Sequence, residues 1–113
     1  MKKSTLLLLL FLPFSVLKSQ SIEGVYDTDF NEMTLQIKDK KVIGTFKYED
    51  GRLEGELKGQ TLTGTWTQSN AKGRFIFVFD ADFCSFKGLW SYNDADPETV
   101  WNGTKTGTLT IKE

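Results

Sequence analysis

Leu53-Glu-Gly-Glu-Leu-Lys-Gly-Gln-Thr-Leu-Thr-Gly-Thr-Trp66 contains two copies of the pattern that decides the fold of this chain. The pattern is a large apolar residue, any residue, glycine, any residue and a large side chain. It occurs six times, starting at Ile22, Val42, Leu53, Leu62, Phe86 and Trp101. Its first, third and fifth positions point to one face of a strand. Glycine is kept inside a strand where the sheet bends or another group packs against the backbone. The repeats therefore predict a strongly coiled sheet.

Short alternating segments rich in Thr, Val, Phe and Trp follow one another between turn residues, which is typical of an all-β protein. We expect strands at 22–28, 33–38, 41–48, 52–58, 61–68, 73–79, 85–92, 99–105 and 108–112. Tight turns are expected at Asp50-Gly51 and Lys58-Gly59-Gln60, because glycine allows a positive φ. Such short connections pair each strand with its neighbour in sequence. The prediction is an up-and-down antiparallel meander barrel of 8–9 strands, although an open, half-wrapped sheet satisfies the same pattern.

Residues 1–20 have the layout of a cleavable secretory signal, which leaves 21–113 as a single β-barrel domain. Lys2 and Lys3 precede an apolar run that is too short to span a membrane, and small and polar residues follow. We expect cleavage near Ser19 or Gln20 and a secreted or periplasmic protein of bacterial type, with no membrane association after cleavage. An uncleaved N-terminal anchor is the alternative.

Charge and cysteine content narrow the possible partners. Residues 21–113 hold eleven basic and fifteen acidic side chains, a net charge of −4. This balance argues against nucleic-acid binding, which requires a basic stripe.

Cys84 is the only cysteine, so no intramolecular disulfide is possible. We expect a buried, inert thiol, with an intermolecular disulfide as the alternative.

Laying the strands out as a meander gathers the Tyr and Trp side chains at one end of the barrel. We call this end, which carries the turns near 28–32, 49–51, 69–72 and 93–98, the first rim. The inward residues nearest the opposite rim are almost purely apolar. An aromatic mouth above an apolar plug is how small barrels hold a single ligand. The candidate ligand-binding residues are Tyr26, Thr28, Asp29, Tyr48, Trp66, Trp90, Tyr92, Asp94 and Trp101. In the alternative interpretation, these rings cap a packed core.

The chemistry available at this mouth is limited. The first rim is rich in Asp and Glu, which favours a cation, although ordinary solvated acidic loops have the same composition. The chain contains no histidine, which removes Ser-His and Cys-His machinery and the usual zinc sites. No carboxylate pair stands out from the others. We therefore predict no catalytic residues, no metal site and no cofactor.

A second candidate surface lies on the outside of the predicted sheet. The segment 75–79 is apolar on both faces, so Ile76 and Val78 would lie outside, beside Leu89 of the next strand. Exposed apolar patches mark interaction sites. These three residues are candidates for contact with a protein partner, a second subunit or the C-terminal strand.

The segments 24–34 and Val42-Ile-Gly-Thr-Phe46 resemble the opening of the avidin-like and lipocalin-like barrels, the calycin group. There a Gly-x-Trp lies on the first strand and, in avidins, a Gly-Thr-Tyr lies on the third. Phe86-Lys-Gly88 is similar to the aromatic-x-Gly of a later avidin strand. The resemblance implies a small barrel with a pocket at one end.

The residues that hold biotin in avidins are mostly not matched. Thr28 stands in place of an asparagine, Glu32 in place of a serine, and Phe46 in place of the tyrosine, while Cys84 replaces a hydroxyl residue. We expect a secreted, non-enzymatic, calycin-like barrel that binds a small ligand at its aromatic, acidic end. The alternative is a protein-interaction module, such as a small protease-inhibitor-like or cell-surface barrel. A glycosidase-like enzyme is the least favoured hypothesis.

Overall fold

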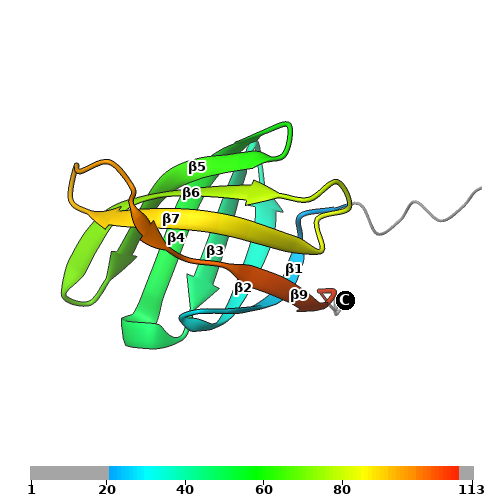
Figure 1. The fold of residues 1–113 in the computed structure, drawn as a ribbon. Coiled ribbons are helices and arrows are strands. Elements are labelled where there is room, and N and C mark those ends of the chain that lie inside the picture. The colour runs from blue at the N-terminus through cyan, green and yellow to red at the C-terminus, as the bar shows by residue number, and fades with distance from the viewer. Residues whose placement is uncertain (1–20, 110–113) are drawn as a thin grey trace, which may run out of the picture.

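The computed structural model describes residues 21–109, whose strands form one antiparallel sheet that closes into a barrel (Figure 1). The strands are β1 (Gly24–Thr28), β2 (Asn31–Lys38), β3 (Lys41–Phe46), β4 (Gly51–Lys58), β5 (Thr61–Gln68), β6 (Ala71–Phe79), β7 (Ser85–Tyr92), β8 (Thr99–Val100) and β9 (Gly103–Gly107). A single 3-10 turn, η3 (Tyr48–Asp50), joins β3 to β4. Among the described residues, no helix is long and apolar enough to cross a membrane. The predicted signal peptide, residues 1–20, lies outside the described part of the chain.

The barrel closes because the last strand returns to the first. Strands β1 to β7 pair in sequence order, and β9 then pairs with both β7 and β1. The short strand β8 adds two pairs to β7, Leu89↔Val100 and Trp90↔Thr99. The ring therefore contains eight strands, with β8 as an extra one, and the predicted antiparallel meander barrel is confirmed.

The C-terminal strands differ from the prediction. The expected strand 99–105 is split into β8 and β9 at Trp101 and Asn102. There the Trp101 N–H donates to the Gly88 carbonyl at 2.9 Å, and the Asn102 side chain accepts the Gly88 N–H at 3.2 Å. Trp101 is thereby turned into the barrel. Thr108 and Leu109 form no strand, and residues 110–112 lie outside the described part.

The repeated glycines are positions of close approach between strands. A Cβ on Gly64 would collide with the Glu54 carbonyl and with Gly55, its direct cross-strand partner. A Cβ on Gly88 would meet the Phe77 ring and the Trp101 carbonyl. Protein atoms thus occupy the space that these glycines leave, as expected where a coiled sheet brings backbone against backbone.

One of the two predicted glycine turns is wrong in detail. Gly59 has a φ of +62° in the β4–β5 turn, as expected. In the β3–β4 turn, however, the positive φ values belong to Glu49 (51°) and Asp50 (56°), whereas Gly51 has a φ of −68°. Gly51 is needed because the Phe46 ring packs where its Cβ would lie.

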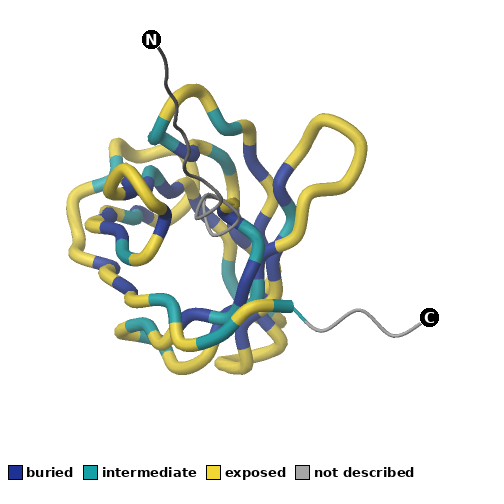
Figure 2. The backbone as a smooth tube through the Cα atoms, turned by 90° about the vertical axis from the view of Figure 1, so that its right-hand side faces the viewer, coloured by how far each residue is buried: buried dark blue, intermediate teal, exposed yellow. Residues whose placement is uncertain are grey.

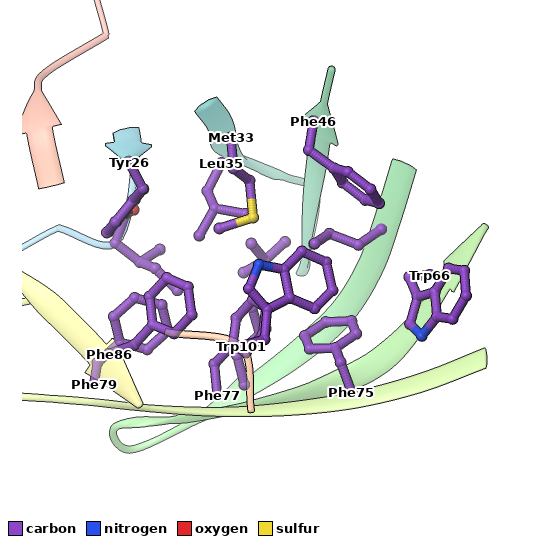
Figure 3. Packing of buried hydrophobic residues seen from close by; sticks show 14 of the residues in the cluster. Tyr26, Met33, Leu35, Phe46, Trp66, Phe75, Phe77, Phe79, Phe86 and Trp101 are labelled. Atoms are coloured by element: carbon purple, nitrogen blue, oxygen red, sulfur yellow. Dashed lines mark hydrogen bonds between the residues drawn. The ribbon is translucent and has the colours of Figure 1, made fainter. Parts of the chain in front are cut away.

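Buried and exposed residues alternate along most of the strands (Figure 2). The inward apolar side chains form one core cluster. Figure 3 shows Tyr26, Phe79 and Phe86 at one end of this core, and Phe46 and Trp66 at the other. We call Ile22, Tyr26, Phe79, Phe83 and Phe86 the apolar plug. Its rings pack closely: Phe79 and Phe86 lie 5.1 Å apart, and Tyr26 lies 5.9 Å from each of them.

The prediction that Cys84 is buried is wrong, since this residue is exposed in the β6–β7 turn. The neighbouring Phe83 has a φ of 60° and is buried against Phe79 at 5.4 Å. The turn thus directs the large ring into the plug and the small thiol outward. Ile37, two residues after the buried Leu35 on the same strand, is 49% exposed.

Candidate ligand-binding pocket at the first rim

A cavity of about 340 Å³ opens at the first rim, and aromatic side chains form most of its lining. We call it the aromatic pocket. It is lined by Phe30, Phe46, Tyr48, Glu49, Trp66, Gln68, Asn70, Ala71, Trp90, Tyr92 and Trp101. All three tryptophans of the chain are among these residues.

The inner part of the pocket is rigidly packed. Phe46, Trp66 and Trp101 are each at most 3% exposed. The Phe46 and Trp101 ring centroids lie 5.2 Å apart at an interplanar angle of 77°. Trp66 is further held by a hydrogen bond of 3.1 Å from its Nε1 to the Ser91 carbonyl. These three rings form a pocket floor that a ligand would find largely preformed.

The walls and the entrance are more exposed than the floor. Phe30 and Trp90 are half-buried and meet edge to face at 5.9 Å. Tyr48 and Tyr92 are 48% and 57% exposed and flank the opening. Tyr92 packs against Trp90 at 4.9 Å and against Trp66 at 5.8 Å. The pocket therefore passes from buried rings to rings with polar tips that reach solvent.

Backbone contacts between two turns hold the polar part of the entrance in place. The Ser69 N–H donates to the Glu49 carbonyl at 3.0 Å, and the Ser69 hydroxyl donates to Oε1 of Glu49 at 2.9 Å. Both Glu49 and Asp50 have a left-handed backbone, which costs on the order of 1 kcal/mol or more for a residue other than glycine. These contacts fix the Glu49 carboxylate at the edge of the pocket.

The structure places five of the nine candidate residues around the pocket: Tyr48, Trp66, Trp90, Tyr92 and Trp101. The sequence located them through the meander alone, because alternate turns of an up-and-down barrel fall at the same end.

Tyr26 does not belong to the group at the pocket. Its ring is fully buried in the apolar plug, and its hydroxyl donates to the Ile22 carbonyl at 2.7 Å. Burial raises the pKa of this phenol well above its ordinary value. The expectation that every Tyr and Trp collects at the first rim is therefore wrong for Tyr26, because its side chain leans back along the strand toward Ile22.

Thr28, Asp29 and Asp94 shape the loops around the pocket and do not line it. The Thr28 hydroxyl accepts the Phe30 N–H at 3.0 Å and donates to the Asn31 carbonyl at 2.8 Å. Asp29 accepts the Asn102 N–H at 2.9 Å. The Asp94 carbonyl accepts a hydrogen bond of 3.1 Å from Nη1 of Arg74.

The sequence interpretation missed several lining residues: Phe30, Phe46, Glu49, Gln68, Asn70 and Ala71. Phe30 had a signal, since it is a large apolar residue in an otherwise polar turn. Phe46 also had one, because it closes a glycine repeat on the inward face. Gln68, Asn70 and Ala71 carry no sequence signal, because only the packing of the β5–β6 turn against η3 brings them to the pocket.

Two buried indole nitrogens, Nε1 of Trp90 and of Trp101, have no hydrogen-bond partner among residues 21–109. A buried donor without an acceptor costs about 1–3 kcal/mol. In Figure 3 the nitrogen of Trp101 lies on the side of the ring toward Met33, and its six-membered ring extends toward Trp66. Trp101 thus presents carbon rather than its N–H toward the Trp66 side of the pocket.

The other polar centre lies at the opposite rim, in the β6–β7 turn. Oδ1 of Asp80 accepts N–H groups from Cys84 at 2.8 Å and Ser85 at 3.2 Å, while Oδ2 accepts the Ser85 hydroxyl at 3.1 Å. Desolvation raises the pKa of Asp80, but these hydrogen bonds outweigh it and lower the pKa below its ordinary value.

A hydrogen bond with Asp82 raises the pKa of the Cys84 thiol, which disfavours the reactive thiolate. In the described part of the chain, no three His, Cys, Asp or Glu side chains are grouped so as to hold a metal ion.

The apolar surface expected on the outside of the sheet is present. Val78 is 50% exposed, Leu89 is 37% exposed, and Ile76 is half-buried beside them. Val100 of β8, paired with Leu89, extends the patch. The use of these residues as a partner or subunit contact stays a prediction.

No protein-family model, curated protein or solved structure matches this chain. The architecture, a small closed antiparallel barrel, is consistent with a calycin-like fold. Membership of the avidin or lipocalin families stays a prediction from sequence resemblance.

Proposed function

We propose that this protein is a non-enzymatic, calycin-like barrel that binds one small ligand in the aromatic pocket. The observation that carries the proposal is a cavity of about 340 Å³ lined by all three tryptophans of the chain. Ligand pockets in proteins begin at about 300 Å³ and are lined mainly by apolar and aromatic side chains with a few polar groups. The aromatic pocket has this size and this composition, with Glu49, Gln68 and Asn70 as the polar groups.

The lining residues favour binding over catalysis. Glu49 is the only carboxylate among them, so the pocket offers no carboxylate pair for acid–base work. The chain has no histidine, and Cys84 lies at the opposite rim. The remaining groups can orient a ligand by stacking and hydrogen bonding. We propose that the protein does this outside the cytoplasm, in keeping with the signal-like segment 1–20.

A variant that fills the pocket tests the proposal directly. Ala71 is a half-buried lining residue with the smallest side chain, so Ala71→Phe would occupy the cavity while adding one ring. Tryptophan fluorescence would be titrated with a panel of small cations, anions and neutral molecules. We expect a saturable change with at least one compound in the natural protein, and its loss in Ala71→Phe, because all three fluorophores line the site.

The matched control is Ala81→Phe, which makes the same change at an exposed position in the turn at the opposite rim. It should leave the titration unchanged. Thermal unfolding of both variants shows that the barrel remains intact. If no compound changes the fluorescence, or if Ala71→Phe binds as well as the natural protein, the pocket is not a ligand site.

A further inference from the structure

The charge around the aromatic pocket is mainly negative, which bears on the class of ligand. The four connections that surround it, residues 29–30, 47–50, 69–70 and 93–98, carry six carboxylates and a single ammonium group, Lys47. Lys47 lies 3.9 Å from Glu32. Arg74, on the neighbouring strand β6, contacts Asp96 at 3.7 Å and donates to the Asp94 carbonyl. A cluster of carboxylates around a concave site focuses a field that attracts cations and repels anions.

The residues that line the pocket also favour a cationic ligand. Among its lining residues, only Glu49 is charged, and seven of the others are aromatic. The face of an aromatic ring carries partial negative charge and attracts a cation placed over it. Trp, the residue type that binds cations best in this way, occurs three times in the lining. Among residues 21–109, no lysine or arginine lines the pocket to pair with a ligand carboxylate or phosphate.

The pocket floor has few polar atoms, which favours weakly hydrated cations over strongly hydrated ones. Phe46, Trp66 and Trp101 make up the floor, and Nε1 of Trp66 is already bonded to Ser91. A primary ammonium group would lose water there and find no acceptor to replace it, which is costly. An alkylated ammonium group is weakly hydrated and needs contact with ring faces instead.

We propose that the ligand of the aromatic pocket is a small organic cation whose charge is carried by an alkylated ammonium group. The proposal rests on the proposed function, since it names the chemical class that the same pocket takes. The alkylated nitrogen lies among the Trp and Phe rings, with Glu49 at the entrance supplying the counter-charge.

The test compares two probes of the same shape that differ in charge. Choline carries a trimethylammonium group, and 3,3-dimethylbutan-1-ol replaces its nitrogen with carbon. Titrated into the full-length protein, choline should bind about tenfold more tightly than the neutral alcohol, the range expected for a desolvated cation–π contact. Raising the salt concentration should weaken the binding of choline alone.

A variant that removes the charge of Glu49 tests whether this carboxylate contributes to the preference for choline. Glu49→Gln keeps an oxygen to accept the Ser69 hydroxyl and removes the charge, so it should weaken choline about two- to fivefold and leave the alcohol unchanged. Asp39→Asn, which removes a carboxylate from the exposed β2–β3 turn at the opposite rim, should change neither.

The outcomes separate this proposal from the function on which it rests. Equal affinity for choline and the alcohol overturns the cationic class and leaves ligand binding intact. The same conclusion follows if choline does not bind while an anionic or neutral compound of the panel does, with loss of binding in Ala71→Phe. If no compound binds, both proposals are wrong.

Discussion

The two ends of this barrel are built from similar aromatic residues and yet differ in packing. At the opposite rim, Phe79, Phe83 and Phe86 close around Tyr26, whose hydroxyl is satisfied by the Ile22 carbonyl. At the first rim, seven aromatic side chains surround a cavity of about 340 Å³. The difference shows that aromatic content does not decide whether a barrel end is filled or hollow. What differs is how far the side chains of the turns fill the space at each end.

The turns at the two ends illustrate this point. In the β6–β7 turn, the left-handed backbone at Phe83 places a ring inside the plug. In the β3–β4 turn, the left-handed residues are Glu49 and Asp50, both exposed, and Tyr48 flanks the opening without filling it. Phe30 of the β1–β2 turn reaches over the first rim and packs against Trp101 at 5.2 Å. Space therefore remains between the floor and the solvent.

The largest expected effect on stability comes from removing an aromatic ring, and it should differ between the two ends of the barrel. Phe86→Ala should lower the free energy of unfolding by about 3–5 kcal/mol, because Phe86 is 2% exposed and stacked on Phe77 at 4.1 Å. Tyr92→Ala, at the pocket entrance, should cost about 1 kcal/mol or less, because the ring is largely exposed. Urea unfolding monitored by circular dichroism measures both. Equal losses would contradict the contrast between a packed end and an open one.

An intermediate effect is expected at a repeated glycine between the two ends. Gly88→Ala should lower the unfolding free energy by about 1–3 kcal/mol, because its Cβ would press on the Phe77 ring and the Trp101 carbonyl. Gly107→Ala is the control: no atom of the described residues lies within 4 Å of the added Cβ, so the stability should change by about 0.5 kcal/mol or less. Thermal unfolding of both variants checks this. A neutral Gly88→Ala would show that close packing does not explain the repeat.

The smallest effect depends on pH and concerns the turn that closes the plug. Because the folded state lowers the pKa of Asp80 below its ordinary value of 3.8, its charge contributes stability above that pH. The contribution is lost as the pH falls through the lowered pKa. Asp80→Asn should therefore unfold at a lower temperature than the natural protein at pH 7, and the difference should shrink below pH 3.8. A difference that persists at low pH would assign the effect to the hydrogen bonds alone.

Strand identity and the pairing of neighbouring strands were predictable from the sequence, because residue alternation and short turns are local properties. Closure was not, since an open sheet satisfies the same pattern and the barrel closes through the long-range pairing of β9 with β1 and β7. Strands β4, β5 and β7 lie within one residue of the expected bounds, and the glycine repeats indicated where strands approach closely. The grouping of Tyr48, Trp66, Trp90, Tyr92 and Trp101 at one end also followed, because strand parity and turn order place them there.

Tertiary structure alone decided which of these rings border a cavity and which fill the core. Tyr26 was assigned to the pocket and lies in the plug, while Cys84 was assigned to the core and lies outside. Both errors arise from side-chain direction and backbone dihedrals, which period-two alternation does not encode. Phe30, Gln68, Asn70 and Ala71 reach the pocket through contacts between turns far apart in the chain. The sequence by itself determined an antiparallel meander with an aromatic end, and the tertiary structure determined that the meander closes into a barrel whose aromatic end stays open.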